Sequence, residues 1–245
     1  MSADERRRWE RLDALRGLAI VWMVGYHLAF DLDHFGFIAQ NFHHDRVWTW
    51  QRTSIVSLFL FSAGIAQAIA LVDATTWPRF WRRWAQIAGS ALLVSAGSWL
   101  MFPRSWIFFG VLHAIAVMLI VVRSTGRWGA WLWLCGALAL ALPHLIDPRL
   151  FDAAWLRWLG LSGRKPITED FVPLLPWLGV MWWGVAVGRW LLRLPARPLA
   201  GSLPRQLSPL AVLGRHSLLI YMLHQPLLIG FVGAAAWALH GRSGN

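Results

Sequence analysis

The sequence predicts an all-α integral membrane protein: a single bundle of about seven transmembrane helices with a cytoplasmic N-terminus. Of the 245 residues, 57% are hydrophobic and only 14% are charged, whereas an ordinary soluble domain is about 25% charged. The apolar residues form continuous runs close to the ~20 residues that a spanning helix needs. Nineteen tryptophans, many of them near the ends of these runs, are typical of belts at a membrane–water interface. We therefore interpret residues 1–245 as one transmembrane domain.

Seven apolar runs define the expected helices. The fourth and fifth are short, and a short span is accommodated by snorkelling flanking residues or by local thinning of the bilayer. The largest connection, residues 144–172, is rich in turn-forming residues and predicts an external loop or a short re-entrant cover. The seven runs are Leu12–Phe35, Thr53–Val72, Trp84–Phe102, Ile107–Val122, Trp128–Pro143, Pro173–Leu192 and Leu213–Trp237.

The distribution of basic residues predicts the orientation. With a cytoplasmic N-terminus, fifteen of the 23 Lys and Arg residues lie in inside segments and eight in outside segments, as the positive-inside rule requires. Much of the net charge of +11 is therefore topological, and anionic membrane lipids are sufficient partners for it. We expect a multi-pass protein of the bacterial inner (cytoplasmic) membrane and no nucleic-acid partner.

The first run carries ionisable side chains at a depth where charge is costly, roughly 2.5–3.5 kcal/mol on insertion scales. Arg16 lies near the cytoplasmic mouth, and His27 follows about 16 Å higher at 1.5 Å per residue. Asp31 lies one turn beyond His27 on the same helix face. A carboxylate at that spacing can hold the imidazole in one tautomer and stabilise its protonated form, as a general base requires. The alternative is a histidine that only bridges two helices.

Two further histidines fall within expected spans. His113, in FFGVLHAIAV, lies near the outer end of the fourth span, so we expect it to approach His27 in depth. His224, in GRHSLLIYMLHQPLL, shares a helix face with Tyr221. We expect the first, fourth and last helices to bound a polar cavity, whose catalytic candidates are His27, Asp31, His113 and His224.

Other features are interpreted as structural. Asp170, just before the sixth span, is expected to cap a helix. Gly184 and Gly188 have the spacing of a close contact between helices. Cys135 is the only cysteine, which excludes an intrachain disulfide. The sequence contains no Walker loop, GxGxxG, HExxH, CxxC or GxSxG motif.

Five stretches along the chain resemble a family of membrane enzymes. In order they are RLDALRGLAIVWMVGYHLAFDL, SLFLFSAGIAQAIA, FFGVLHAIAV, DFVPLLPWLG and LGRHSLLIYMLHQP. The spacing Arg16-x10-His27 resembles the first-helix signature of transmembrane acyltransferases, a broad group in which the arginine and the histidine are regarded as essential. Taken together, the stretches are similar to small bacterial relatives of the heparan-α-glucosaminide N-acetyltransferase catalytic domain, a family long classed as a domain of unknown function.

The resemblance implies transfer of an acyl group, typically acetyl from acetyl-CoA, to an amine or hydroxyl of a glycan or glycolipid at or across the membrane. Guanidinium groups at the inner rim can hold the phosphates of CoA, and the expected donor-binding residues are Arg16, Arg215 and Tyr221. His27 would deprotonate the acceptor or accept the acyl group itself, with Asp31 balancing the imidazolium. Heparan is not inferred as the acceptor.

Two other functions are compatible with the same intramembrane side chains. A transporter or channel for a small polar or anionic solute would also need them, although the sequence lacks the internal repeats that many transporters show. A haem or metal protein could use His27, His113 or His224 as ligands. Because the spacing of these histidines matches no ligand motif, no metal is expected.

Overall fold

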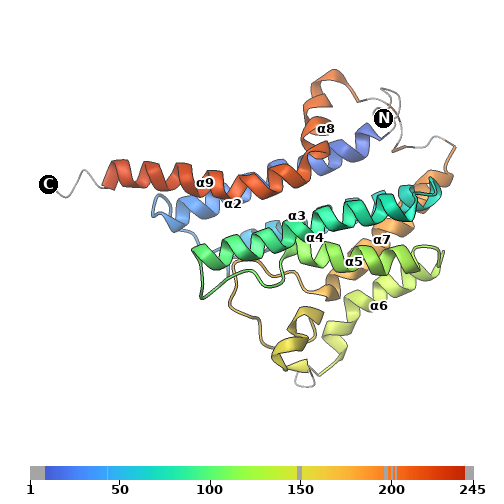
Figure 1. Ribbon diagram of the computed structural model, residues 1–245, viewed down its shortest axis with the longest axis horizontal. Coiled ribbons are helices and arrows are strands. Elements are labelled where there is room, and N and C mark those ends of the chain that lie inside the picture. The colour runs from blue at the N-terminus through green and yellow to red at the C-terminus, as the bar shows by residue number, and fades with distance from the viewer. Residues whose placement is uncertain are drawn as a thin grey trace. The chain divides into compact units, whose positions relative to one another are not determined.

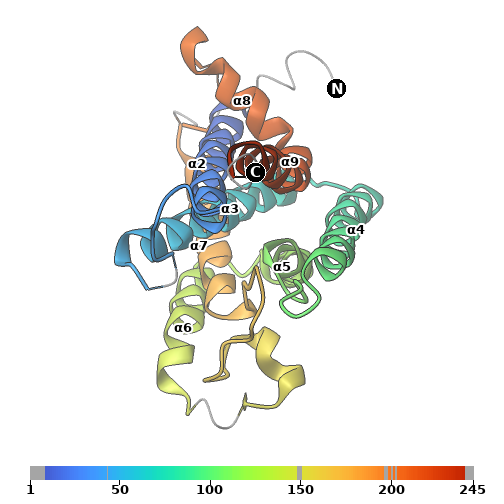
Figure 2. The ribbon, with the colours of Figure 1, turned by 90° about the vertical axis from the view of Figure 1, so that its left-hand side faces the viewer.

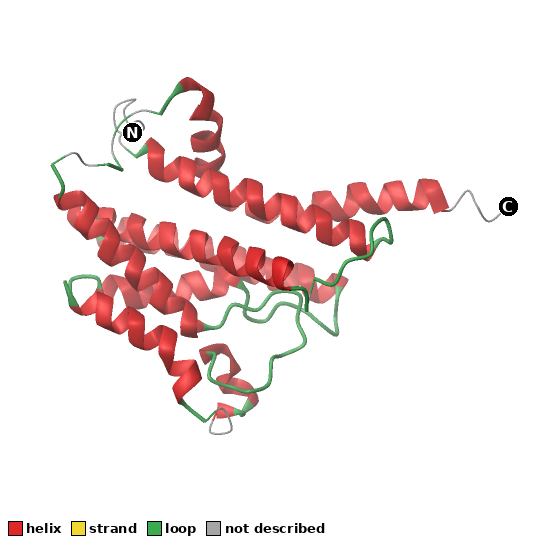
Figure 3. Ribbon diagram, turned by 180° about the vertical axis from the view of Figure 1, so that it is seen from behind, coloured by secondary structure: helices red, strands yellow, loops and turns green. Residues whose placement is uncertain are grey.

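The computed structural model describes residues 9–42, 44–147, 151–195, 198–199, 201 and 203–240, and these residues form helices joined by loops, with no strand among them (Figure 1, Figure 3). This confirms the predicted all-α class. The chain forms two compact units. Unit 1 comprises Met1–Phe59 together with Leu199–Asn245, and unit 2 comprises Leu60–Pro198. The boundary falls within one helix, α3 (Arg46–Val72).

Unit 1 is built around α2 (Glu10–His34). Helix α9 (Ser217–His240) runs beside α2, and α8 (Ser208–Arg215) crosses it near its N-terminal end (Figure 1, Figure 2). Two glycines permit the crossing. Gly17 lies against the backbone of Leu210, and Gly214 lies against the backbone of Asp13, so that a Cβ at either glycine would overlap the opposing carbonyl.

An aromatic and aliphatic core holds unit 1 together. Its buried members come from α2, from the loop that follows α2, and from the first part of α3, and they are Ile20, Met23, Tyr26, Phe42 and Ile55. The rings of Phe42 and Trp48 lie 4.2 Å apart, and the Tyr26 ring meets both edge-on. Side chains of α9 pack against this core, which fixes α9 beside α2.

Unit 2 contains the remainder of α3 followed by four longer helices and a short 3-10 helix. They are α4 (Trp77–Met101), α5 (Val111–Thr125), α6 (Trp131–Leu145), η2 (Ala154–Leu159) and α7 (Leu174–Arg193). Helix α7 packs against both α5 and α6. Gly184 and Gly188 bring α7 onto α3, where they face the backbone of Phe61 and Ile65 and the side chain of Ala68. The close contact predicted from their spacing is confirmed.

The helices differ from the predicted spans in one important respect. The last predicted span, Leu213–Trp237, is two helices, because α8 ends at Arg215 and α9 begins at Ser217. The residue between them, His216, donates its backbone N–H to the carbonyls of Val212 and Leu213, which closes the end of α8. A short 3-10 helix, η3 (Arg205–Leu207), leads into α8.

Three helices of the described residues, α2, α3 and α9, are long and apolar enough to cross a membrane. Helices α5 and α6 are apolar but have 15 residues each, which gives about 22 Å at 1.5 Å per residue. That is shorter than the ~30 Å hydrocarbon core. The seven-span arrangement and the cytoplasmic N-terminus therefore stay predictions, whereas the apolar helices themselves are those of a membrane protein.

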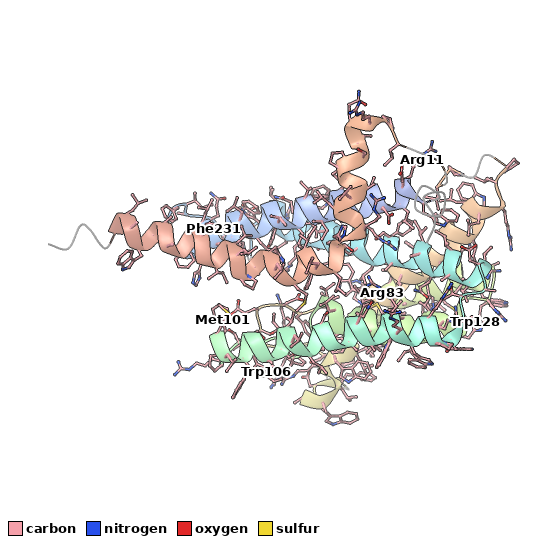
Figure 4. The ribbon with its side chains drawn as sticks, turned by 45° about the horizontal axis from the view of Figure 1, so that its top comes forward. Arg11, Arg83, Met101, Trp106, Trp128 and Phe231 are labelled. Carbon is pink, nitrogen blue, oxygen red and sulfur yellow. The ribbon has the colours of Figure 1, made fainter. Side chains whose placement is uncertain are left out.

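Aromatic side chains gather at both ends of unit 2. Trp106 lies with Met101 toward the C-terminal end of α4, and Trp128 lies at the opposite end, toward Arg83 (Figure 4). All four side chains are exposed. Tryptophans at the two ends of a helical layer are the arrangement of interfacial belts.

The connection predicted as an external loop or cover, residues 144–172, returns to the start of α5. Phe109 pairs with Phe171 in an isolated parallel β-bridge, and Val172 donates its N–H to the Phe109 carbonyl at 3.2 Å. Asp170 acts as a cap, as predicted, but for a different helix. Its Oδ2 accepts the N–H of Val111, the first residue of α5, at 2.8 Å.

Candidate active site

Two histidines meet in unit 1, one from α2 and one from α9. Nε2 of His224 lies 3.2 Å from Nδ1 of His27, and the two rings are 4.9 Å apart between centroids. His224 is buried, with 8% of its surface exposed, whereas His27 is half-buried. The structure thus brings together two of the predicted site residues, separated by 197 positions in the chain.

The hydrogen-bond partners of the two imidazoles indicate which nitrogen of each ring carries the proton. Nδ1 of His27 is 3.0 Å from the Met23 carbonyl, and Nδ1 of His224 is 2.7 Å from the Tyr221 carbonyl. A carbonyl only accepts, so each Nδ1 carries a proton. Nε2 of neutral His224 is then an acceptor that faces the Nδ1–H of His27. In neutral His27 the lone pair is consequently on Nε2, which makes no hydrogen bond within the described residues.

Asp31 lies one turn above His27, at the face shared by α2 and α9. Its Oδ1 accepts a hydrogen bond from Nε2 of Gln225 at 2.9 Å. The sequence predicts that Asp31 orients the His27 imidazole, but the hydrogen bonds of His27 go to Met23 and His224 instead. The groups that orient His27 at Nδ1 are therefore a backbone carbonyl and a second imidazole rather than a carboxylate.

Two buried oxygens in this cluster lack hydrogen-bond partners among the described residues. They are Oδ2 of Asp31 and Oε1 of Gln225. Asp31 has only 2% of its surface exposed, and an unpaired buried carboxylate oxygen is costly. Both atoms are acceptors, so the group that would satisfy them is one that donates hydrogen bonds, such as an amine or a hydroxyl.

Aromatic side chains flank the histidine pair. Tyr26 meets the His27 ring edge-on at 5.6 Å, and the Tyr221 ring lies 5.6 Å from that of His224. Tyr221, predicted to bind the donor, is packed against the core of unit 1. These ring contacts hold the imidazoles in place.

The two arginines predicted to bind CoA belong to the crossing of α2 and α8. Nη1 of Arg16 lies 3.3 Å from Oδ1 of Asp13, one turn earlier on α2. Arg215 follows Gly214, which contacts the backbone of Asp13. Arg16 and Arg215 therefore both lie beside Asp13, where α2 and α8 are in contact.

His113 belongs to unit 2, and both of its ring nitrogens have partners there. Nδ1 accepts the N–H of Gly110 at 3.3 Å, which caps the start of α5. Nε2 lies 3.1 Å from Oγ of Ser95, whose own proton goes to the Ile107 carbonyl. His113 therefore donates from Nε2 and ties α5 to α4. This arrangement supports a structural role, and its catalytic assignment stays a prediction.

Sequence reasoning missed Gln225. An amide beside a histidine inside an apolar run is itself a signal, because polar side chains in a span are retained where they bond across helices. The described residues contain no group of three or more His, Cys, Asp or Glu side chains that could hold a metal ion.

These features define a class: an all-helical membrane protein with a histidine pair and a buried carboxylate–amide contact between two of its helices. The model of the family "Heparan-alpha-glucosaminide N-acetyltransferase, catalytic" matches residues 8–226, and the chain belongs to this family. Searches of curated proteins and of solved structures each gave no significant match. The family resemblance seen in the sequence is confirmed, and membership indicates an acetyltransferase-type function. The matched range includes His27, Asp31, His224 and Gln225.

Proposed function

We propose that this protein is an integral-membrane acyltransferase that moves an acyl group, in the first instance acetyl, from CoA to a sugar amine or hydroxyl. The transfer would take place at or across the bacterial inner membrane, with the N-terminus in the cytoplasm. The observation that carries the proposal is the 3.2 Å contact between His224 and His27. The Met23 carbonyl assigns the proton to Nδ1 of His27, His224 accepts a hydrogen bond from the same nitrogen, and Nε2 is left as a base or nucleophile.

In the first route His27 is a general base. Nε2 takes the proton of the acceptor amine or hydroxyl while the acceptor atom attacks the thioester carbonyl. The C–S bond then breaks, and the CoA thiolate leaves with the proton that Nε2 had taken. His224 faces the opposite nitrogen of His27, so it shares the charge of the imidazolium through the Nδ1 proton.

In the second route His27 carries the acyl group. Nε2 attacks the thioester carbonyl, CoA leaves as the thiolate, and an N-acyl imidazolium forms. The Nδ1 proton can move to Nε2 of His224, which lies 3.2 Å away. The acceptor then attacks the acyl carbon and the bond from that carbon to Nε2 breaks. The proton held by His224 returns to Nδ1, the acceptor's proton passes to the CoA thiolate or to solvent, and free His27 is restored. Both routes need the same pair of rings.

The remaining site residues are assigned to the two substrates. Arg16 and Arg215 would hold the phosphates of CoA, since guanidinium groups bind phosphate through paired donors, and Tyr221 would also lie on the donor side. Asp31 and Gln225 would bind the acceptor, because their unpartnered oxygens accept from an N–H or O–H group.

The test is to incubate membranes that contain the protein with acetyl-CoA labelled in the acetyl group, and to identify what becomes labelled. Label on a glycan or glycolipid supports acyl transfer by either route, and additional label on a His27 peptide after acid-free digestion supports the carrier route. Membranes with His27→Ala protein provide the background. Equal labelling in both membranes, or none above background, overturns the proposal, and solute flux without CoA would favour a transporter.

A further inference from the structure

A basic cavity lies at one end of unit 2, where the C-terminal ends of α3 and α7 meet the loop that follows α5. It has a volume of about 430 Å³ and is lined by Leu71, Val72, Arg127, Arg189, Leu192 and Arg193. A second hollow of about 170 Å³ adjoins it, because Arg189 and Arg193 line both. Trp133 and Trp190 line the second hollow. The histidine pair belongs to the other unit, and none of its residues lines either hollow.

The three arginines of the cavity carry positive charge that no carboxylate of the described residues balances in an ion pair. Among the described residues none of the three forms an ion pair, whereas Arg16 and Arg164 each lie within 4 Å of an aspartate oxygen. No acidic side chain lines either hollow. Three guanidinium groups around one cavity therefore call for an anion with several acceptor oxygens, and phosphate is the anion whose geometry suits paired N–H donors.

The other walls of the cavity are apolar. Leu71, Val72 and Leu192 line it directly. The two indole rings that line the adjoining hollow are exposed: Trp190 has 56% of its surface exposed and Trp133 has 46%. Exposed tryptophans mark the level of lipid headgroups. A ligand that joins a phosphate to hydrocarbon chains can pack against these apolar walls, whereas a fully water-soluble phosphate would make no apolar contact with them.

Arginines near helix C-termini also neutralise terminal carbonyls, and Arg189 does so by donating from Nη1 to the Gly126 carbonyl at 2.9 Å. This role occupies one donor of one arginine. Arg127 and Arg193 make no such hydrogen bond within the described residues, and both are exposed. Capping therefore explains the position of Arg189 in part. It does not explain Arg127 or Arg193, or the cavity that the three arginines line.

We propose that this cavity binds the phosphate of an anionic glycerophospholipid, which is held by Arg127, Arg189 and Arg193, with the acyl chains running along Leu192 and Trp190. Basic pockets between membrane helices are known recognition sites for such headgroups. The site would anchor α7 and the loop after α5 to the membrane, and it does not depend on the acyltransferase proposal.

The test compares phosphatidylglycerol with phosphatidylcholine on the purified full chain in neutral detergent, where no membrane surface contributes to attraction. Lipid retention is measured by native mass spectrometry. The variant is Arg127→Gln/Arg193→Gln, which leaves Arg189 and its cap intact. The matched control is Arg79→Gln/Arg82→Gln, which removes two exposed arginines at the start of α4, next to the end of α3 but outside the cavity.

We expect wild type and control to retain phosphatidylglycerol in preference to phosphatidylcholine, and the cavity variant to bind it about 30-fold more weakly, at ~1 kcal/mol per arginine. A photoactivatable phosphatidylglycerol should crosslink to the peptide containing Leu192, which tests the site without any substitution. Equal retention by both double variants, or crosslinks elsewhere only, overturns the proposal. Loss of acetyl-CoA binding with unchanged lipid retention would instead assign the cavity to CoA and would equally overturn it.

Discussion

Nε2 of His224 lies 3.2 Å from Nδ1 of His27 and accepts a hydrogen bond from it, although the two residues are 197 positions apart. The pair depends on the packing of α9 against α2, which the core around Tyr26 and Tyr221 maintains. A second imidazole thus occupies the place that an aspartate takes in a serine-protease triad. Four consequences for the site and its supporting structure can be tested separately.

His224→Ala should lower kcat by about 10²-fold, at the lower end of the range for general acid–base catalysis, because Nδ1 of His27 loses its side-chain acceptor and keeps only the Met23 carbonyl. His224→Gln should recover part of the loss, since the amide oxygen can accept the same proton. The KM for acetyl-CoA should stay unchanged in both. Steady-state kinetics of monodisperse protein provide the measurement. Equal kcat for wild type and the alanine variant would contradict the role of His224.

Asp31→Asn should preserve the stability of the protein but weaken binding of the acceptor. The amide oxygen can keep the hydrogen bond from Gln225 while an unpaired buried charge is removed, so the melting temperature should not fall. The KM for the acceptor should rise about tenfold or more, because a hydrogen bond to a charged group contributes roughly 1.5–3 kcal/mol. Asp33→Asn is the control, since Asp33 is outside the cluster and bonds Gln40. An unchanged acceptor KM would exclude Asp31 from acceptor binding.

Gly17→Ala should destabilise the protein by about 1–3 kcal/mol, as overpacking does, because the new methyl group meets the Leu210 backbone. The backbone of α8 cannot move aside as a flexible side chain would. Gly25→Ala is the matched control on the same helix, since nothing lies within 4 Å of its Cβ position, and it should be neutral or slightly stabilising. Thermal unfolding in detergent measures both. Equal melting temperatures would show that α8 does not cross α2 at Gly17.

His113→Ala should reduce stability while activity per folded molecule stays within about a factor of two. The lost cap and bridge to Ser95 should cost about 0.5–2 kcal/mol, the range for loss of a cap. The paired measurement of melting temperature and specific activity decides between two roles. A large loss of kcat at unchanged stability would instead support a catalytic role for His113.

The sequence alone was sufficient for the helical class and the family, because each depends on local pattern or composition. It also selected His27 and His224 as candidates, and the structure brings these two side chains together, whereas their catalytic roles stay predictions. It could not predict what orients His27. The i, i+4 spacing favoured Asp31, but α9 supplies both the His224 ring and the Gln225 amide at that level. The break at His216 was missed for a similar reason: hydropathy continues through it, and only the hydrogen bonds of α8 show that one helix ends there.

The most direct test is the transfer rate of purified His27→Gln protein with labelled acetyl-CoA and the acceptor that becomes labelled in membranes. His34→Gln, an exposed histidine at the end of the same helix, is the control. Wild type and control should have rates within twofold of each other, and His27→Gln should lose at least the ~10²–10⁴-fold that general acid–base catalysis contributes. A folded His27→Gln protein that transfers acetyl at the wild-type rate would contradict the proposed mechanism.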